Sequence, residues 1–134
     1  MSAPAQNPAA IQTTELIDRY IAMWNETDAP RRRALIARTW TAGASYLDPL
    51  MQGEGHAGID AMVQAVQTAY PGNRFRRTSE VDLHHGRVRF AWTLGPDGGP
   101  ALAQGIDFGV LDESGEGALL STITGFLDQP VAGH

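Results

Sequence analysis

The 134-residue sequence contains no cysteine. The chain can therefore form no disulfide, use no thiolate nucleophile and build no zinc site that depends on cysteine. No apolar run approaches the roughly 20 residues that span a bilayer as a helix. Residues 1–10 also lack the basic start and the apolar stretch of a secretory signal. We expect a cytoplasmic protein with no membrane partner.

Charged residues make up only 19% of the chain, and the formal net charge is −5. The arginines form two short clusters, within 31–33 and 74–77, but no basic stripe. We interpret both clusters as solvated surface and expect no nucleic-acid partner. The histidines His56, His84 and His85 lack the spacing of metal ligands. The string 53–58 spells G-x-G-x-x-G without the buried strand that should precede a nucleotide loop, so we expect no metal and no other cofactor.

The length and the 43% hydrophobic content fit one globular domain with one core. Residues 1–11 are rich in Pro, Ala and Gln, and we expect them to form a disordered tail. Residues 12–130 contain all the periodic segments and are predicted to form the single domain.

Three helices are predicted in the first half of the chain. Thr13 or Thr14 can cap the first, and Asp28 suits the N-cap of the second, with Pro30 in its first turn. The third follows residues 55–58 and ends at Pro71-Gly72. Each helix has an apolar stripe at three- and four-residue spacing. The stripes are Leu16, Ile17, Tyr20, Ile21 and Trp24; Leu35, Ile36 and Trp40; and Ile59, Met62, Val63, Val66 and Tyr70.

Strand signals dominate the second half. A short strand at 44–49 ends at a proline, and four longer strands are predicted after Gly72, separated by turn residues. The four cover about 73–84, 87–95, 101–112 and 118–128. Strands that follow one another through short turns form an antiparallel meander, and helices followed by strands indicate an α+β fold.

The strand at 101–112 has two unlike faces. One carries Leu102, Ile106, Phe108 and Val110, and the other carries mostly Ala and Gly with Asp107 among them. Small residues allow a helix to approach or leave a cavity. A carboxylate in that row must be paired, hydrogen-bonded or protonated. Asp107 is therefore either a structural acid or part of a pocket wall.

Other candidates for chemistry each have a structural interpretation as well. Asp48 precedes Pro49, where it is either a turn opener or an acid or base. Tyr20 is a core tyrosine or a ligand contact. His56 caps a helix or touches the ligand. Trp24 and Trp92, with Met62 and Val66 of the third helix, are predicted as core or pocket wall.

Several strings in a fixed order resemble the nuclear transport factor 2-like superfamily over about residues 12–128. They are Tyr20-Ile-Ala-Met-Trp-Asn25, Tyr46-Leu-Asp48-Pro49, Gly55-x-x-Gly58-Ile59, Gly105-Ile106-Asp107 and Gly125-Phe126. Within the superfamily they are most similar to SnoaL-like polyketide cyclases and ketosteroid isomerases. The resemblance implies a cone-shaped, cystatin-like fold, in which three N-terminal helices and a curved, mostly antiparallel sheet enclose a ligand pocket.

The resemblance also implies site residues. The general base of the isomerases matches Asp48, and the two groups of their oxyanion hole match Tyr20 and Asp107. In such a hole the apolar surroundings keep the aspartic acid neutral, so that it can donate a hydrogen bond. Our leading hypothesis is therefore a cofactor-independent enzyme that moves a proton next to a carbonyl group of a small apolar ligand, giving isomerisation or aldol-type cyclisation. The alternative is a non-catalytic ligand-binding or dimerisation module. Relatives dimerise through the outer sheet face, so we expect a homodimer there.

Overall fold

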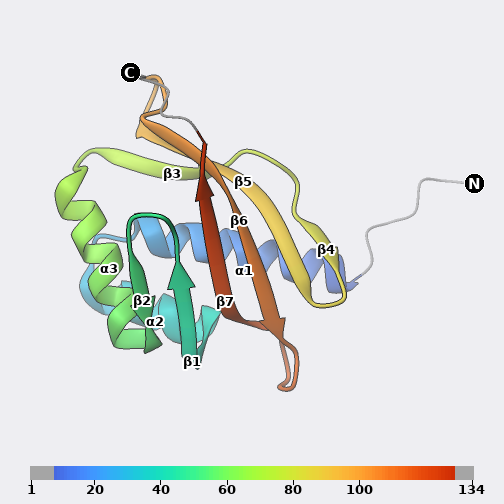
Figure 1. The fold of residues 1–134 in the computed structure, drawn as a ribbon. Coiled ribbons are helices and arrows are strands. Elements are labelled where there is room, and N and C mark those ends of the chain that lie inside the picture. The colour runs from blue at the N-terminus through green and yellow to red at the C-terminus, as the bar shows by residue number, and fades with distance from the viewer. Residues whose placement is uncertain (1–7, 129–134) are drawn as a thin grey trace, which may run out of the picture.

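The computed structural model describes residues 8–128, which form three helices and a seven-stranded sheet (Figure 1). The helices are α1 (Pro8–Asn25), α2 (Ala29–Thr39) and α3 (Gly55–Ala69). The strands are β1 (Trp40–Leu47), β2 (Gln52–Glu54), β3 (Asn73–Arg77), β4 (Asp82–His84), β5 (Arg87–Pro96), β6 (Ala103–Asp112) and β7 (Leu119–Leu127). None of these helices is long and apolar enough to cross a membrane.

The sheet runs in the order β2-β1-β7-β6-β5-β3, with β4 also paired to β5. Every neighbouring pair is antiparallel except β1 and β7, which are parallel. The three helices lie together on one side of the curved, unclosed sheet (Figure 1). The predicted α+β, cystatin-like fold with a mostly antiparallel sheet is confirmed.

The core forms where the helix stripes meet the inner face of the sheet. Leu16, Ile17 and Tyr20 of α1 are at most 2% exposed, and they belong to one buried cluster with Phe90 of β5 and Ile123 of β7. The ring of Tyr20 lies 5.7 Å from that of Phe90. Burying a large apolar side chain contributes about 1.5–3 kcal/mol, so this cluster stabilises the contact between helices and sheet. On β6 the two predicted faces are real, because Asp107 is buried while Ile106 and Phe108 are partly exposed.

Some predicted boundaries were wrong. Helix α1 starts at Pro8 rather than at Thr13, so residues 8–11 are helical, while residues 1–7 of the expected tail lie outside the described part. Proline is well suited to the first helical position, because the amide hydrogen that it lacks has no partner there, and the alanines that follow favour a helix. Trp40 is the first residue of β1 and not part of the α2 stripe. Leu102 precedes β6, so strand alternation does not place it on the outer face, and its N–H donates to the carbonyl of Leu94.

The predicted strand at 73–84 is split. The hydroxyl of Ser79 accepts a hydrogen bond from the Ala91 N–H at 2.8 Å, and the Thr78 N–H donates to the Ala91 carbonyl at 2.9 Å. A side chain thus replaces a backbone acceptor. The pairing with β5 is therefore interrupted between β3 and β4.

A side chain of α1 closes the outer edge of β3. Asn25 donates through Nδ2 to the carbonyl of Phe75 at 2.9 Å and accepts the Phe75 N–H through Oδ1 at 2.8 Å. The amide of Asn25 thereby pairs with one residue of β3 as a neighbouring strand would, and it fixes Phe75 beside the end of α1.

The sequence suggested that the whole arginine cluster at 31–33 is solvated, but this prediction is wrong for Arg32. Arg32 is 1% exposed and joins α2 to α3, because its guanidinium donates to Asp60 at 2.6 Å and to the side-chain carbonyls of Gln64 and Gln67. The same guanidinium donates to the carbonyl of Glu26 at 3.0 Å. A buried cation requires partners of this kind, and here they fix the packing of the two helices.

Candidate functional site

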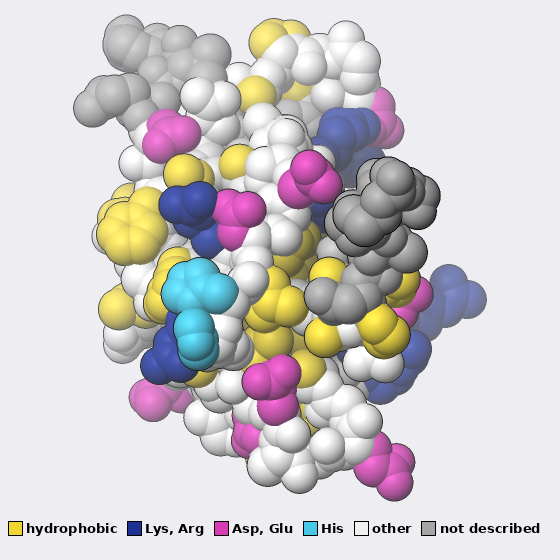
Figure 2. Space-filling view, turned by 90° about the vertical axis from the view of Figure 1, so that its right-hand side faces the viewer, with side chains coloured by type: hydrophobic (Ala, Val, Ile, Leu, Met, Phe, Trp, Pro, Cys, Tyr) yellow, Lys and Arg dark blue, Asp and Glu magenta, His cyan; other side chains and the backbone are white. Residues whose placement is uncertain are grey.

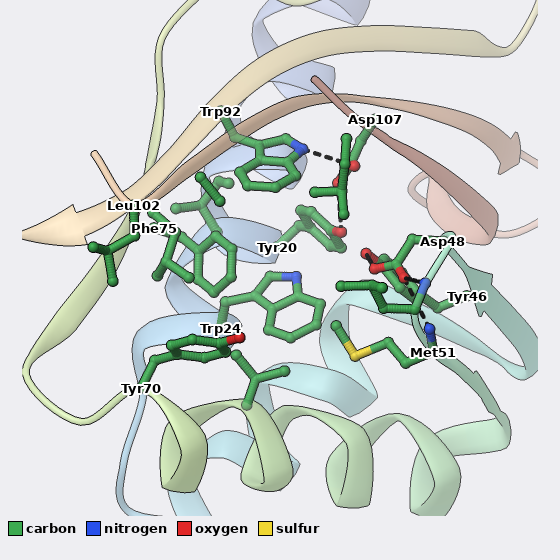
Figure 3. A pocket seen from close by; sticks show the side chains of 16 residues that line it. Tyr20, Trp24, Tyr46, Asp48, Met51, Tyr70, Phe75, Trp92, Leu102 and Asp107 are labelled. Atoms are coloured by element: carbon green, nitrogen blue, oxygen red, sulfur yellow. Dashed lines mark hydrogen bonds between the residues drawn. The ribbon is translucent and has the colours of Figure 1, made fainter. Parts of the chain in front are cut away.

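A pocket opens between α1, α3 and the inner face of the sheet (Figure 3). Its walls are mainly apolar and aromatic, and two carboxyl groups, those of Asp48 and Asp107, reach it. The apolar and aromatic members of the lining are Tyr20, Ile21, Trp24, Tyr46, Leu50, Met51, Val66, Tyr70, Phe75, Trp92, Leu94, Leu102, Ala103 and Leu127. An apolar hollow with a few convergent polar groups is the usual form of a small-molecule site.

Asp107 lies at the centre of the sheet and is 3% exposed. The Tyr20 hydroxyl donates to its Oδ2 at 2.7 Å and the Trp92 indole N–H donates to its Oδ1 at 2.9 Å (Figure 3). Burial raises the pKa of Asp107 to about 6, although the hydrogen bonds from Tyr20 and Trp92 lower it; the charge of Asp48 raises it further. The group is therefore close to half-protonated at a mildly acidic pH, which suits proton transfer.

Asp48 follows directly after β1, where the chain turns. Its Oδ1 accepts the backbone N–H groups of Leu50 and Met51 at 2.7 and 2.9 Å, and its Oδ2 accepts the Tyr46 hydroxyl at 2.6 Å. All three partners donate, so they hold the side chain of Asp48 in one orientation.

The side chains of Asp48 and Asp107 approach the same point because residue 125 has no side chain. A Cβ added at Gly125 would lie 2.9 Å from Asp107 Oδ1, 3.2 Å from Asp48 Cβ and 3.2 Å from the Tyr46 hydroxyl oxygen. Gly125 pairs with Asp107 across the β6–β7 ladder, and Tyr46 pairs with Ile123 of β7. The parallel β1–β7 pairing thus brings Asp48 beside Asp107.

Tyr46 is the site residue that sequence reasoning missed. It is 4% exposed, and burial together with the charges of Asp107 and Asp48 raises the pKa of its hydroxyl, which stays protonated and donates to Asp48. The signal was present: Tyr46 and Asp48 are two residues apart, a spacing that puts both on one face of an extended segment. Burial and the neighbouring Asp107 raise the pKa of Tyr20 in the same way.

The remaining predicted residues divide into two groups. Trp24, Trp92 and Val66 line the pocket, as the sequence suggested. Met62 does not reach it, because it lies in the core one helical turn earlier than Val66. His56 also lies elsewhere: its Nε2 is 3.0 Å from the carbonyl of Trp40, and it borders a separate hollow between α2 and α3.

Aromatic rings form one wall of the pocket. The ring of Phe75 lies 5.0 Å from that of Trp24 and 5.6 Å from that of Trp92, and Tyr46 lies 5.6 Å from Trp24. The sequence had not identified Phe75, because a lone aromatic residue among arginines resembles an edge-strand residue. No Arg or His of residues 8–128 lines this pocket, so its electrostatic character is set by the two carboxyl groups. The described residues contain no group of three or more His, Asp and Glu side chains that could hold a metal ion.

Solved structures relate this fold and site to known proteins. A candidate isomerase of the SnoaL-like family from Agrobacterium tumefaciens strain C58 is 39% identical, with 88% of this chain and 98% of that chain covered, at a TM-score of 0.81. A nuclear transport factor 2-like protein with a cystatin-like fold from Novosphingobium aromaticivorans is 18% identical over 93% of this chain and 86% of that one, at a TM-score of 0.72. A candidate SnoaL-like polyketide cyclase from Jannaschia sp. CCS1 is 16% identical over 94% and 92%, at a TM-score of 0.71. No protein-family model and no curated protein sequence matched.

The helices on a curved sheet therefore have the cystatin-like fold of these solved structures. The identity of 39% over most of both chains narrows this assignment: the chain belongs to the SnoaL-like family.

Proposed function

We propose that this protein binds a small, mostly apolar carbonyl compound and catalyses proton transfer at the carbon next to the carbonyl group. The observation that carries the proposal is the convergence of two differently supported carboxyl groups on one apolar pocket. Asp48 accepts hydrogen bonds from three donors, whereas burial raises the pKa of Asp107 to about 6. Two titratable groups with different environments are the usual arrangement for a base and an acid.

In the proposed reaction the Asp48 carboxylate removes a proton from the carbon next to the carbonyl. The electron pair of the broken C–H bond forms a C=C bond, and the carbonyl π pair moves to the oxygen. Protonated Asp107 and Tyr20 donate hydrogen bonds to that oxygen, which carries the developing charge. Where a C=C bond of the ligand adjoins the deprotonated carbon, the charge extends over it, and Asp48 returns the proton to the far carbon of that bond, giving an isomer with a shifted double bond. Alternatively, the enolate carbon attacks a second carbonyl of the ligand, and the new alkoxide takes the proton, giving a ring.

The amino-acid composition supports an enolate route. The chain contains neither cysteine nor lysine; all ten of its Lys and Arg residues are arginine. A Schiff base with a lysine amine, the common covalent way to activate a carbonyl compound, is therefore excluded. Hydrogen bonds from neutral donors remain the means of stabilising the charge on oxygen.

Filling the pocket should favour the protonated form of Asp107. The free pocket already raises the pKa of Asp107 by burial, and a bound apolar ligand removes more water from it. The charge of Asp48 acts in the same direction. The neutral acid can then donate to the ligand oxygen while it still accepts from Trp92.

Binding of 4-nitrophenol, whose phenolate resembles an enolate, tests these roles. Isothermal titration calorimetry should give at least tenfold weaker binding for Asp107→Ala and an intermediate loss for Asp107→Asn, which still donates. Asp48→Asn should bind no worse than wild type, since it removes a nearby negative charge. Asp82→Asn, an exposed carboxylate on β4, is the matched control. Equal binding by all variants would make Asp107 a structural acid.

A non-catalytic binding module is the second candidate. It is favoured by the observation that both oxygens of Asp107 already have hydrogen-bond donors within the protein. The two candidates differ in exchange of the protons next to a carbonyl: incubation of acetophenone with the protein in D₂O should label its methyl group faster than buffer, and Asp48→Asn should abolish the acceleration. Absence of any acceleration with acetophenone and with larger aryl ketones would favour the binding module.

We further propose a homodimer through the outer face of the sheet. Ile106 and Phe108 of β6 and Phe126 of β7 are 38%, 40% and 58% exposed, and the β6–β7 ladder makes them neighbours. This face is seen in profile at the left of Figure 2, where hydrophobic side chains gather beside basic ones. A contiguous exposed apolar patch is typical of an interface between subunits. We also propose that the protein is cytoplasmic, as expected from the sequence.

A further inference from the structure

The mouth of the pocket is unusual in that its rim is apolar and exposed. Leu50, Tyr70 and Leu102 all line the pocket, yet they are 75%, 46% and 47% exposed, and Leu127 beside them is 36% exposed. The polar groups of Asp107, which is 3% exposed, and of half-buried Asp48 lie on the side of the pocket away from Leu102 and Tyr70 (Figure 3). An exposed apolar rim that continues the wall of a cavity indicates that a ligand covers it.

The interior is small. The cavity measures about 150 Å³, which is the size of a buried cavity that holds one benzene molecule. One ring therefore fits between the aromatic wall and Asp107, whereas a fused-ring system would have to extend through the mouth.

The charge of the site favours an uncharged ligand head. No cationic side chain among the described residues lines the pocket, so an anionic head would meet two carboxyl groups without compensation. A cationic head has no advantage either, because five N–H and O–H donors already satisfy the two carboxyl groups.

From these observations we infer that the natural ligand has two parts: an uncharged, single-ring head whose oxygen lies at Asp107, and an apolar tail that leaves through the mouth across Leu50. The position of the oxygen rests on the proposed function, while the single ring and the tail rest on the cavity and its rim alone. Leu50 belongs to the turn whose N–H groups hold Asp48. A tail on Leu50 therefore also covers that turn and shields Asp48 from water.

A series of 4-alkylphenols from phenol to 4-heptylphenol tests the tail. Titration calorimetry should show affinity rising two- to fourfold per methylene, the range between half and full burial of a CH₂ group. Leu50→Ser keeps the backbone N–H groups that hold Asp48. In this variant the affinity should hardly rise with each added methylene group. Leu47→Ser is the matched control, since Leu47 is 51% exposed but does not line the pocket. Leu102→Ser gives a second test at the rim if Leu50→Ser fails to fold.

Other ligands test the head. 2-Naphthol and 9-phenanthrol should bind more weakly than the alkylphenols of equal carbon number, as should 4-alkylbenzylammonium ions and 4-alkylbenzoates of matched length. Tighter binding of the fused rings would overturn the single-ring head, and tighter binding of either ion would overturn the uncharged head. If Leu50→Ser changes the oligomeric state of the free protein, the rim is a contact between copies and the tail is refuted.

The experiments can refute the proposed tail without refuting the proposed function, and the reverse. A flat alkylphenol series, with 4-nitrophenol binding still dependent on Asp107, refutes the tail and leaves the chemistry in place. A rising series that is unaffected by Asp107→Ala supports the tail and refutes the proposed role of Asp107.

Discussion

The ionisation of Asp107 should make the protein less stable as the pH rises through the mildly acidic range. Its pKa is about 6 in the folded protein, against about 3.9 in an unfolded chain. The folded state thus holds this proton more tightly than the unfolded state does. The stabilisation is fully present below about pH 4 and is lost as the pH rises through 6.

The magnitude follows from the difference of about two pKa units, at 1.36 kcal/mol per unit, which gives nearly 3 kcal/mol in total. Most of the loss falls between pH 4 and pH 6, and roughly 1.3 kcal/mol of it falls between pH 5 and pH 7. Asp107→Asn removes this titration while it keeps the shape of the side chain. Its carbonyl can still accept from Trp92, and its amide can donate to the Tyr20 hydroxyl.

Urea denaturation of both proteins at pH 5, 6 and 7 measures the effect. The free energy of unfolding of wild type minus that of Asp107→Asn should fall by roughly 1.3 kcal/mol between pH 5 and pH 7, since all other titrations cancel in the difference. Asp82→Asn, whose carboxylate is 60% exposed, should show no such trend. A difference that stays constant across this range would mean that Asp107 has an ordinary pKa, and the argument for a neutral donor would then fail.

Three further predictions follow from the packing. Gly125→Ala places a methyl group against the carboxyl oxygen of Asp107 and the Cβ of Asp48, and it should weaken 4-nitrophenol binding at least tenfold. Gly43→Ala, where an added Cβ meets nothing within 4 Å, should have no effect; equal binding would contradict the convergence. Light scattering should show a homodimer for wild type and a monomer for Phe108→Glu; a wild-type monomer at micromolar concentration would refute the proposed interface. Arg32→Met should lower the free energy of unfolding by about 1–3 kcal/mol, because the oxygens of Glu26, Gln64 and Gln67 lose their donor while Asp60 keeps only Arg33. Arg31→Met, at an exposed position, should lower it by less than about 0.5 kcal/mol; similar losses would show that Arg32 is dispensable.

The elements that could be predicted from the sequence are those with a strong local pattern. Asp107 stood out because a lone acid in a row of Ala and Gly residues has few explanations in a buried strand. Tyr20 and Trp24 followed from the helix period, which fixes the buried face. The same period could not tell which turn of α3 reaches the pocket: Met62 and Val66 share one stripe, and only the angle between helix and sheet decides between them.

Other features depend on contacts between distant parts of the chain. Arg31, Arg32 and Arg33 are identical in local chemistry. Both Arg32 and Arg33 contact Asp60, but only Arg32 also meets Gln64 and Gln67 of α3, and only Arg32 is buried. The role of Gly125 depends on the parallel pairing of β1 with β7, which joins residues about 80 positions apart and leaves no local signal. Such long-range pairings are the part of a fold that a single sequence specifies least directly.

Asn25 has a consequence for how copies of this protein can meet. The ends of a sheet are where foreign strands add, because their backbone groups are unpaired, and such addition leads to aggregates and swapped domains. Here one end of the sheet is β2, which is only three residues long, and at the other end the side chain of Asn25 already occupies both backbone groups of Phe75. A second chain therefore finds no long open ladder to extend. The proposed contact between sheet faces uses no strand edge and closes after two subunits, unlike open-ended stacking into fibres.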